Sequence, residues 1–200
     1  MAKYVSTEAG DAWKNFRPDN LDIIFLVGGD GTVRKLTEVL LTHISDRRIP
    51  VHLLPLGTAN NIAKTLRVSK ETDNRWMNVD RNMKPFDCGR IVGLPGQQFF
   101  LESTGFGIFP ELIFEMKGTP AKGDSSNALQ TALKVLLRIV KNFEPRKATI
   151  KVDGIVIQGS FLLVELMNIQ YLGPNIDLAP GSDPGDGYFE LVMIPGKRRA

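Results

Sequence analysis

The chain has 200 residues, of which 42% are hydrophobic and 24% charged, with a net charge of +3 at pH 7. This composition is globular and excludes a disordered chain, and the length allows one ordinary domain or two small ones. The absence of any block of five or six basic residues argues against nucleic acid as a partner, and the single cysteine excludes an internal disulfide. No apolar stretch reaches the length of a membrane span, so we expect a cytoplasmic protein.

The first half of the chain alternates between patterns typical of strands and of helices. The expected elements are a strand at 3–5, a helix at 8–16 capped by Ser6 or Thr7, a strand at 21–27, a helix at 33–44, a strand at 51–54 and a helix at 62–66. The continuous apolar run at 21–27 is typical of a strand buried on both faces. Strand–turn–helix repeated in this way predicts an α/β fold with a parallel sheet.

From residue 99 onward the pattern is mostly β, with one strong helix. The expected elements are a helix at 127–143, a hairpin at 148–159 turning at Asp153-Gly154, and strands at 160–167 and 188–194. The basic face of the helix could lie against anionic lipid headgroups, although a solvated face on a packed helix is the simpler interpretation. The change in composition predicts an α/β domain at residues 1–88 and a β-rich domain at 89–200.

A glycine-rich turn, "VGGDGT", follows the first buried strand and precedes a helix. Gly28, Gly29 and Gly31 would let the backbone approach a phosphate at the positive end of the helix. Thr32 could cap the helix or donate its hydroxyl to a phosphate oxygen. Asp30 would repel a phosphate, so it is expected to bind a sugar hydroxyl, an adenine amine or a magnesium ion. The alternative is a plain strand-to-helix turn with an aspartate cap.

A second turn, "PLGTANN", repeats this design after the next strand. Thr58, after Gly57, could hold a phosphate, and Asn60 and Asn61 could read a hydroxyl or cap the helix. Loops at the carboxyl ends of neighbouring parallel strands border one crevice. The chain lacks a Walker motif, and Arg34 stands where the dinucleotide-binding fingerprint needs its last glycine. The paired turns therefore indicate a different kind of nucleotide site.

"VGGDGTV" followed by "PLGTANNIAKTL" resembles the diacylglycerol kinase catalytic domain, especially bacterial diacylglycerol and related lipid kinases. The first motif alone is shared with NAD kinases, and the second discriminates in favour of lipid kinases. "FDCGRI" and "LMNIQYLGPNIDLAPGSDPGDGYFELVMI" resemble the crossing into, and a block of, the family's β-sandwich domain. The resemblance implies a nucleotide-binding α/β domain of the NAD kinase and diacylglycerol kinase type, followed by a partial β-sandwich.

The resemblance also implies a function, transfer of the γ-phosphoryl group of ATP to the hydroxyl of a diacylglycerol-like lipid at a membrane surface, with Mg²⁺. The residues that would bind the nucleotide are Thr7, Gly28, Gly29, Asp30, Gly31, Thr32, Gly57, Thr58, Asn60 and Asn61. Asp87 would join Asp30 in a water and magnesium network. A structural magnesium would use the Asp186 carboxylate with backbone oxygens of Asp183 and Tyr188, the alternative being a simple hairpin turn.

The sequence departs from the family pattern at both ends. The usual first strand with its N-P-x-[SA]-G loop is not present, nor is the D-G-E motif whose glutamate is the proposed general base. Asp30 is the fallback candidate for that base. Two alternatives therefore stay open: a nucleotide-binding remnant without turnover, and a soluble-substrate kinase of the NAD kinase type. Exposed edge strands could also pair two chains into a homodimer.

Overall fold

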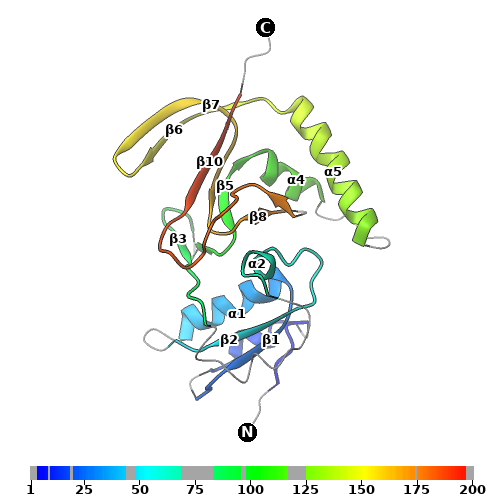
Figure 1. The fold of residues 1–200 in the computed structure, drawn as a ribbon, viewed down its shortest axis with the longest axis vertical. Coiled ribbons are helices and arrows are strands. Elements are labelled where there is room, and N and C mark those ends of the chain that lie inside the picture. The colour runs from blue at the N-terminus through cyan, green and yellow to red at the C-terminus, as the bar shows by residue number, and fades with distance from the viewer. Residues whose placement is uncertain are drawn as a thin grey trace. The chain divides into compact units, whose positions relative to one another are not determined.

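The computed structural model of the chain describes residues 4–8, 10–18, 20–43, 48–68, 83–95, 98–116, 125–173 and 175–196, with the backbone alone at 125–129. The chain divides into two compact units, Met1–Pro85 and Phe86–Ala200, and each is described by itself (Figure 1). The sequence-based boundary, at residue 88, falls near the start of the second unit.

The first unit is a small α/β arrangement. Its elements are the 3₁₀ turn η1 (Ala12–Asn15), β1 (Ile24–Gly28), α1 (Asp30–His43), β2 (Val51–Pro55) and α2 (Asn61–Thr65). β1 and β2 pair in parallel, with Ile24 opposite Val51 and Gly28 opposite Pro55. The alternating pattern of strands and helices thus produces the parallel α/β fold that the sequence predicts. Its buried apolar side chains include Leu26 of β1, Val39 of α1, Trp13 of η1, and Ile62 and Ala63 of α2.

Two predicted elements of this unit differ from the structure. The strand expected at 3–5 is not formed at Tyr4 or Val5, and residue 3 lies outside the described residues. The helix expected at 8–16 is only the single turn η1: the Ser6 hydroxyl accepts the N–H of Glu8 at 3.2 Å, but Gly10 has a left-handed backbone with φ 62°, which an α-helix cannot contain. The predicted helix residue Ile44 also lies outside the described part of the chain.

The second unit is built around one long strand. Its elements are β3 (Gly89–Ile91), β4 (Gln98–Phe100), β5 (Ser103–Gly107), α4 (Ile108–Met116), α5 (Ser125–Asn142), β6 (Arg146–Val152), β7 (Ile155–Met167), β8 (Tyr171–Leu172), β9 (Ile176–Asp177) and β10 (Glu190–Pro195). β7 pairs antiparallel with β5, β6 and β10. The predicted hairpin is confirmed, and its turn has positive φ at Asp153 (48°) and Gly154 (79°).

The helix α4 was not predicted, since the sequence indicated a single helix after residue 99. Its residues, IFPELIFEM, are mostly apolar and carry too few polar side chains to show a helical period. Pro110 falls in the first turn, where its missing N–H has no intrahelical partner to lose. Ile108, Phe109 and Leu112 are buried, whereas Ile113 and Phe114 are 53% and 71% exposed, so α4 is a helix with one buried face whose exposed face is also apolar.

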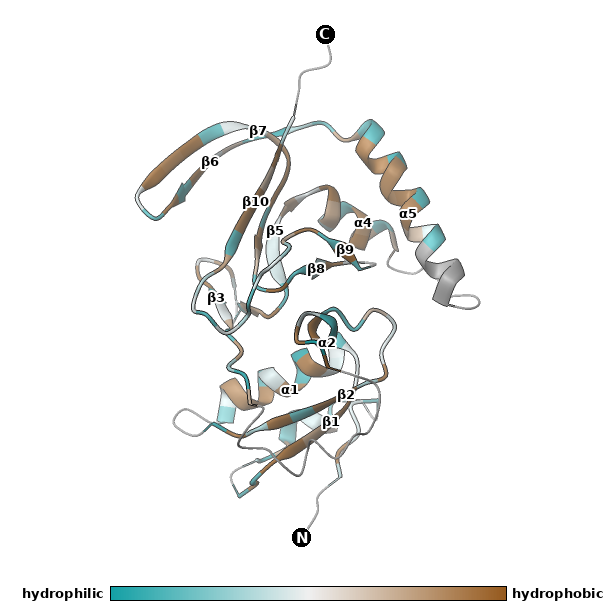
Figure 2. Ribbon diagram, viewed as in Figure 1, coloured by the Kyte–Doolittle hydropathy of each residue, from teal (hydrophilic) through white to brown (hydrophobic). Residues whose placement is uncertain are grey.

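The core of the second unit lies between these helices and the β7 sheet. α4 contributes Ile108, Phe109 and Leu112, α5 contributes Ile139, and β7 contributes Leu163 and Met167, with Leu172 and Ala179 completing the cluster. Figure 2 shows hydrophobic residues along β7 and on α4 and α5. Burial of these side chains, at roughly 1.5–3 kcal/mol each, is the main stabilisation of the unit.

Glu165 is a buried acid within this apolar face of β7. It is 4% exposed. It lies two residues after Leu163 and two before Met167 on the strand, so its side chain points to the same face of the sheet as theirs. The Ser103 hydroxyl donates to its Oε1 at 2.7 Å, and its Oε2 has no hydrogen-bond partner among the described residues. Gly105 makes room for it, because a Cβ there would lie 2.3 Å from Oε2. Desolvation raises the pKa of Glu165 above its ordinary value, although the Ser103 hydrogen bond lowers it in part.

Glu165→Gln is expected to make the protein more stable at pH 8 while changing its stability little near pH 4. Because the pKa of Glu165 is raised by folding, its stabilising contribution is complete below the unfolded pKa and is lost as the pH rises through the folded pKa. The neutral amide avoids this loss. Melting temperatures of both proteins between pH 4 and pH 8 test this, with Glu190→Gln on β10 as the control. A difference between wild type and variant that is constant over this range would contradict the expectation.

Candidate functional site

The two glycine-rich turns lie beside each other in the first unit. Each turn begins at the carboxyl end of a strand, and β1 and β2 are parallel neighbours in register. The pairing continues into the turns, where the Leu56 N–H donates to the Gly28 carbonyl at 3.0 Å. The turns predicted to border one crevice are therefore adjacent in space.

The backbones of the turns touch at Gly29 and Gly57. A Cβ on Gly29 would lie 2.7 Å from the Gly57 Cα, and a Cβ on Gly57 would lie 2.4 Å from the Gly29 Cα. Gly28 is restricted in a similar way, because a Cβ there would lie 2.4 Å from Oγ1 of Thr32. The glycines in these motifs are needed for close packing of two main chains as well as for any approach of a ligand.

Asp30 connects the two turns. Its Oδ2 accepts the N–H of Asn61 and its Oδ1 accepts the N–H of Ile62, both at 3.0 Å. These are the first amides of α2, so the carboxylate caps this helix from another element and lies at the positive end of its dipole. Asp30 itself begins α1, where the Gly29 carbonyl accepts the N–H groups of Thr32 and Val33. The sequence suggested a ligand contact or a local cap, but not a cap for α2.

Asn60 closes the second turn on itself. Its Oδ1 accepts the Gly57 N–H at 2.9 Å, and its Nδ2 donates to the Gly57 carbonyl at 2.7 Å. The residue has a left-handed backbone, φ 53°, and makes no capping bond to α2. The prediction that Asn60 caps the helix is therefore wrong, because its amide is engaged with Gly57 and Asp30 provides the cap. Asn61, the other candidate, is buried as the first residue of α2.

Four hydrogen-bond donors remain available around the start of α1. The N–H groups of Asp30 and Gly31 have no acceptor within the described ranges, and a Cβ on Gly31 would meet nothing within 4 Å. Thr32 is half-buried and Thr58 is exposed, and the hydroxyl of neither makes a hydrogen bond to any described residue. Free amides at the start of a 14-residue helix, beside hydroxyls, are suited to bind an anionic ligand such as a phosphate group.

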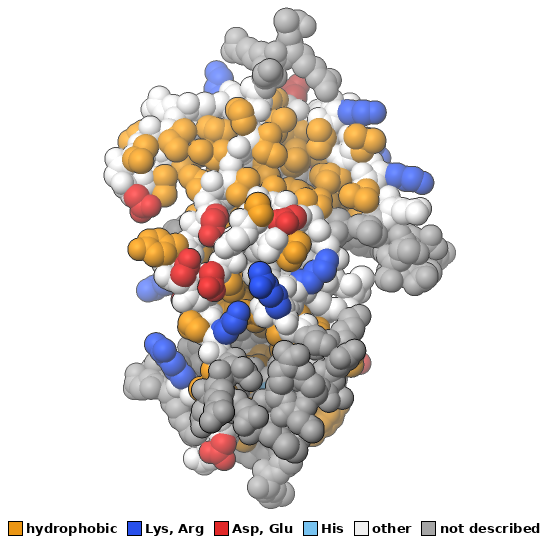
Figure 3. Space-filling view, viewed as in Figure 1, with side chains coloured by type: hydrophobic (Ala, Val, Ile, Leu, Met, Phe, Trp, Pro, Cys, Tyr) orange, Lys and Arg blue, Asp and Glu red, His pale blue; other side chains and the backbone are white. Residues whose placement is uncertain are grey.

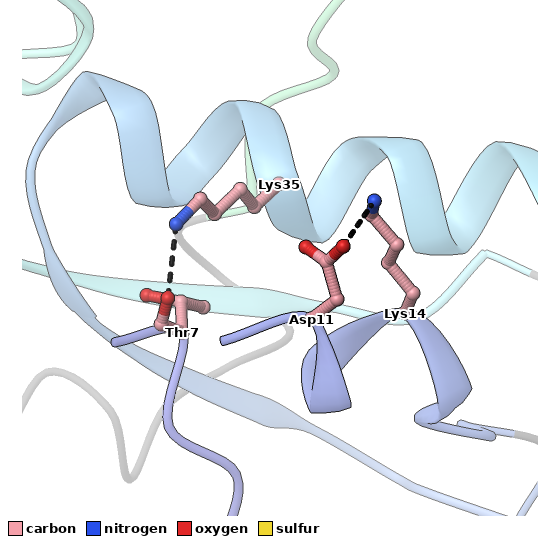
Figure 4. A network of polar contacts seen from close by, with 4 residues as sticks. All are labelled: Thr7, Asp11, Lys14 and Lys35. Carbon is pink, nitrogen blue, oxygen red and sulfur yellow. Dashed lines mark hydrogen bonds and ion pairs between the residues drawn. The ribbon is translucent and has the colours of Figure 1, made fainter. Parts of the chain in front are cut away.

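Thr7, the remaining nucleotide-binding candidate, is held against α1. Its carbonyl accepts a hydrogen bond from Nζ of Lys35 at 2.9 Å (Figure 4). The same ammonium lies 5.7 Å from the centre of the Trp13 ring. The neighbouring contact in that view is the exposed ion pair of Asp11 with Lys14, 3.0 Å long. Lys35 thus fixes the segment before η1 onto the helix that starts at the glycine turn.

Asp87 is fixed within the second unit. Its Oδ2 accepts the Gly187 N–H at 2.8 Å, and its backbone N–H donates to the Pro184 carbonyl. Asn168, 1% exposed, donates through Nδ2 to the Asp87 carbonyl at 2.9 Å and to the Leu101 carbonyl at 2.8 Å. Sequence reasoning missed Asn168, although a lone amide in an apolar run was a usable signal. The predicted network between Asp87 and Asp30 would join the two units, and it stays a prediction.

The loop predicted to bind magnesium is folded by its own aspartates. Oδ1 of Asp183 accepts the Gly185 N–H at 3.1 Å, and Oδ1 of Asp186 accepts the Tyr188 N–H at 2.9 Å. The Asp183 carbonyl accepts the Asp186 N–H at 3.3 Å. No group of three or more metal-ligating side chains occurs among the described residues. Oxygen ligands suit Mg²⁺ chemically, and the magnesium site with the Asp186 carboxylate and the backbone oxygens of Asp183 and Tyr188 stays a prediction.

In the part of the chain that the structure describes, no helix combines the length and apolar character that a membrane span requires.

Known proteins resemble this chain over nearly its whole length. Residues 3–91 match the family described as the diacylglycerol kinase catalytic domain, and residues 125–200 match the YegS C-terminal NAD kinase beta sandwich-like domain. A diacylglycerol kinase of Bacillus subtilis (strain 168) is 29% identical over 96% of this chain and 62% of its own length. A protein of Alcanivorax borkumensis named "Probable lipid kinase YegS-like" is 28% identical over 98% of this chain and 63% of its own length.

A solved structure agrees with these matches. A crystal structure of a diacylglycerol kinase from Bacillus anthracis str. Sterne superposes with a TM-score of 0.64 at 27% identity, covering 95% of this chain and 60% of that one. The chain therefore spans about three fifths of the length of these relatives. The two domain matches, their order along the chain and the glycine turns of the first unit lead to one conclusion: residues 3–91 belong to the diacylglycerol kinase catalytic domain family, and residues 125–200 to the YegS C-terminal NAD kinase beta sandwich-like domain family.

Proposed function

We propose that this chain carries the nucleotide site of an ATP-dependent lipid kinase that phosphorylates the hydroxyl of a diacylglycerol-like lipid. The observation that carries the proposal is the joined pair of glycine turns, which leaves the Asp30 and Gly31 amides and the Thr32 and Thr58 hydroxyls available to phosphate oxygens. The lipid acceptor is proposed from the names of the relatives, which are diacylglycerol or lipid kinases.

The arrangement explains how an acid can be part of a phosphate-binding turn. Both oxygens of Asp30 accept amides of α2, so its negative charge is compensated by a helix terminus. The open backbone at Gly31 and the two threonine hydroxyls would then hold the phosphates of ATP, which would supply the γ-phosphoryl group. We assign Asp30 a positioning role, because both of its oxygens accept amides of α2 and the carboxylate is thereby fixed against that helix.

The proposed partner is a lipid in a bilayer, which the protein would reach as a peripheral protein in the cytoplasm. Magnesium is proposed with the nucleotide, as is usual in phosphoryl transfer. The proposed binding of ATP does not depend on the loop that contains Asp183 and Asp186. A homodimer through edge strands stays a prediction.

ATP with magnesium is expected to raise the melting temperature saturably, by several degrees at about 100 times the dissociation constant. Thr58→Val removes one hydroxyl that would donate to a phosphate, and it should weaken ATP binding about tenfold. Thr149→Val, at an exposed threonine of β6, is the matched control and should bind ATP as wild type does. A titration followed by differential scanning fluorimetry measures all three.

The same titrations separate the alternatives. Formation of NADP from ATP and NAD, with no phosphatidate formed from diacylglycerol, would overturn the lipid kinase proposal in favour of a soluble substrate. A shift with ATP but no phosphatidate formed from diacylglycerol would favour a nucleotide-binding protein without turnover. If neither nucleotide shifts a well-folded protein, or if Thr149→Val weakens ATP binding as much as Thr58→Val, the assignment of the site fails.

A further inference from the structure

One end of the apolar face of the β7 sheet carries polar side chains. Ser103 of β5 and Glu190 of β10 both lie opposite Met167 of β7, and Glu165 precedes Met167 by two residues. Directly opposed residues of antiparallel strands share a face, as do alternate residues of one strand, so the three polar side chains lie on the face that Met167 turns to the core. The next positions on that face are apolar: Leu163, Val192 and Ile194. The face therefore passes from polar to apolar along the strands.

The carboxyl of Glu165 has one oxygen with a hydrogen-bond donor and one without. The Ser103 hydroxyl donates to Oε1 at 2.7 Å, whereas Oε2 is buried and accepts no hydrogen bond from any described residue. Since only 4% of Glu165 is exposed, water does not replace the missing donor freely. A buried acceptor without a donor is unfavourable in free energy, and nearly all buried acceptors in proteins have one. Oε2 is thus placed to receive a donor from a ligand.

The unsatisfied oxygen lies close to the surface at an edge of the sheet. Among the described strands β5 pairs with β7 alone, which makes β5 an edge strand. Gly105 of β5 is exposed, and a Cβ on it would lie 2.3 Å from Oε2 of Glu165. Any side chain at position 105 would displace the carboxyl, and the glycine lets it lie directly beneath the exposed backbone of β5. A ligand at this edge therefore has only a short way to Oε2.

The number of acceptors indicates which kind of donor the site can satisfy. A magnesium or calcium ion takes six or more oxygen ligands, and an ammonium group has three donors. No group of three or more metal-ligating side chains occurs in the described ranges, and the surroundings of Oε2 on this face are largely apolar. A hydroxyl has a single donor, which one carboxylate oxygen satisfies. The site therefore suits an alcohol with an apolar body, which is the chemistry of a diacylglycerol-like acceptor.

We propose that Glu165 binds the acceptor lipid, with Oε2 accepting a hydrogen bond from the lipid hydroxyl and the half-buried Val192 and Ile194 in contact with its apolar part. The identity of this ligand rests on the proposed function, which names a lipid but no residue that holds it. Ser103 is a positioning residue, because its hydroxyl holds the other oxygen of the carboxyl. Figure 3 shows, on the face in view, a broad area of exposed hydrophobic side chains on this unit, a surface compatible with an apolar ligand.

Two ligands that differ by one hydroxyl test this contact: dioctanoylglycerol, and the dioctanoyl ester of 1,2-propanediol, which lacks the hydroxyl. Thermal-shift titrations of the full chain give a dissociation constant for each. Wild type is expected to bind dioctanoylglycerol about tenfold more tightly, because the other ligand cannot donate to the charged acceptor. Glu165→Leu with Ser103→Ala replaces both partners of the buried pair by apolar groups. This variant should melt at least as high as wild type and bind the two ligands equally.

Glu144→Leu, at an exposed acid after α5, is the matched control and should retain the tenfold preference. Equal binding of the two ligands by wild type, or binding of neither, would overturn the proposal. So would a preference that survives in the double variant or is lost in the control. The wild-type comparison needs no substitution, so it decides the matter even if the double variant does not fold.

The ATP shift is measured on the same proteins and separates this contact from the proposed function. A preference for dioctanoylglycerol without any ATP shift would retain the role of Glu165 and refute the proposed kinase. An ATP shift without the preference would retain the nucleotide site and refute the role of Glu165.

Discussion

Gly57→Ala is expected to lower the free energy of unfolding by roughly 2–3 kcal/mol, the cost of overpacking a closely packed site. The added methyl group would lie 2.4 Å from the Gly29 Cα, 2.8 Å from Oδ1 of Asn60 and 3.0 Å from the Gly29 nitrogen. Two of these atoms belong to the main chain, which cannot move independently. The Leu56–Gly28 hydrogen bond and the parallel pairing of β1 with β2 hold it in place.

Gly31→Ala, in the neighbouring motif, is the matched control. A Cβ there meets nothing within 4 Å, and the residue is already helical, so stability should be unchanged or rise by up to about 1 kcal/mol. Urea denaturation of the three proteins measures the contrast. Equal stabilities for the two variants would mean that the backbones do not touch as described.

Asp30→Ala is expected to cost about 2–4 kcal/mol of unfolding free energy, because it removes two charge-assisted hydrogen bonds and leaves two amides of α2 without a partner. Asp30→Asn should cost less, since its amide retains one oxygen that can accept one of the N–H groups. Asp11→Ala, which removes only an exposed ion pair with Lys14, should have no measurable effect.

Stability and turnover together test the role of Asp30. If Asp30 caps α2 and positions the turn, the free energy of unfolding and the affinity for ATP should both fall in Asp30→Ala. Both should recover partly in Asp30→Asn. An Asp30→Asn protein as stable as wild type, with full ATP affinity but no turnover, would support the general-base role and contradict ours.

The sequence predicted the order of elements in the first unit because strands and helices there differ in length and pattern. The hairpin at Asp153-Gly154 was predictable for a similar local reason, since its two residues set the turn. Helix α4 was missed because its uniformly apolar residues have no period to detect. Local patterns thus indicate the fold, except where an element is apolar on its exposed face as well as on its buried one.

The location of the candidate site could be predicted from the sequence, but its hydrogen-bond partners could not. The glycines and threonines indicated two turns at neighbouring strand ends. The sequence could not show that Asp30 bonds to amides 31 and 32 positions further along the chain. The role of Asn168 was missed for the same reason, because its partners Asp87 and Leu101 are 81 and 67 positions away in the sequence. Contacts of this length depend on the tertiary fold.

The bridge from Asp30 to α2 also sets which sequences this turn tolerates. The carboxylate binds main-chain N–H groups, so the contact itself places no demand on the side chains at positions 61 and 62. An aspartate at 61 would keep the same two donors. Proline alone lacks the N–H. It is often favoured at the first position of a helix, and here it would be excluded from the first two positions of α2.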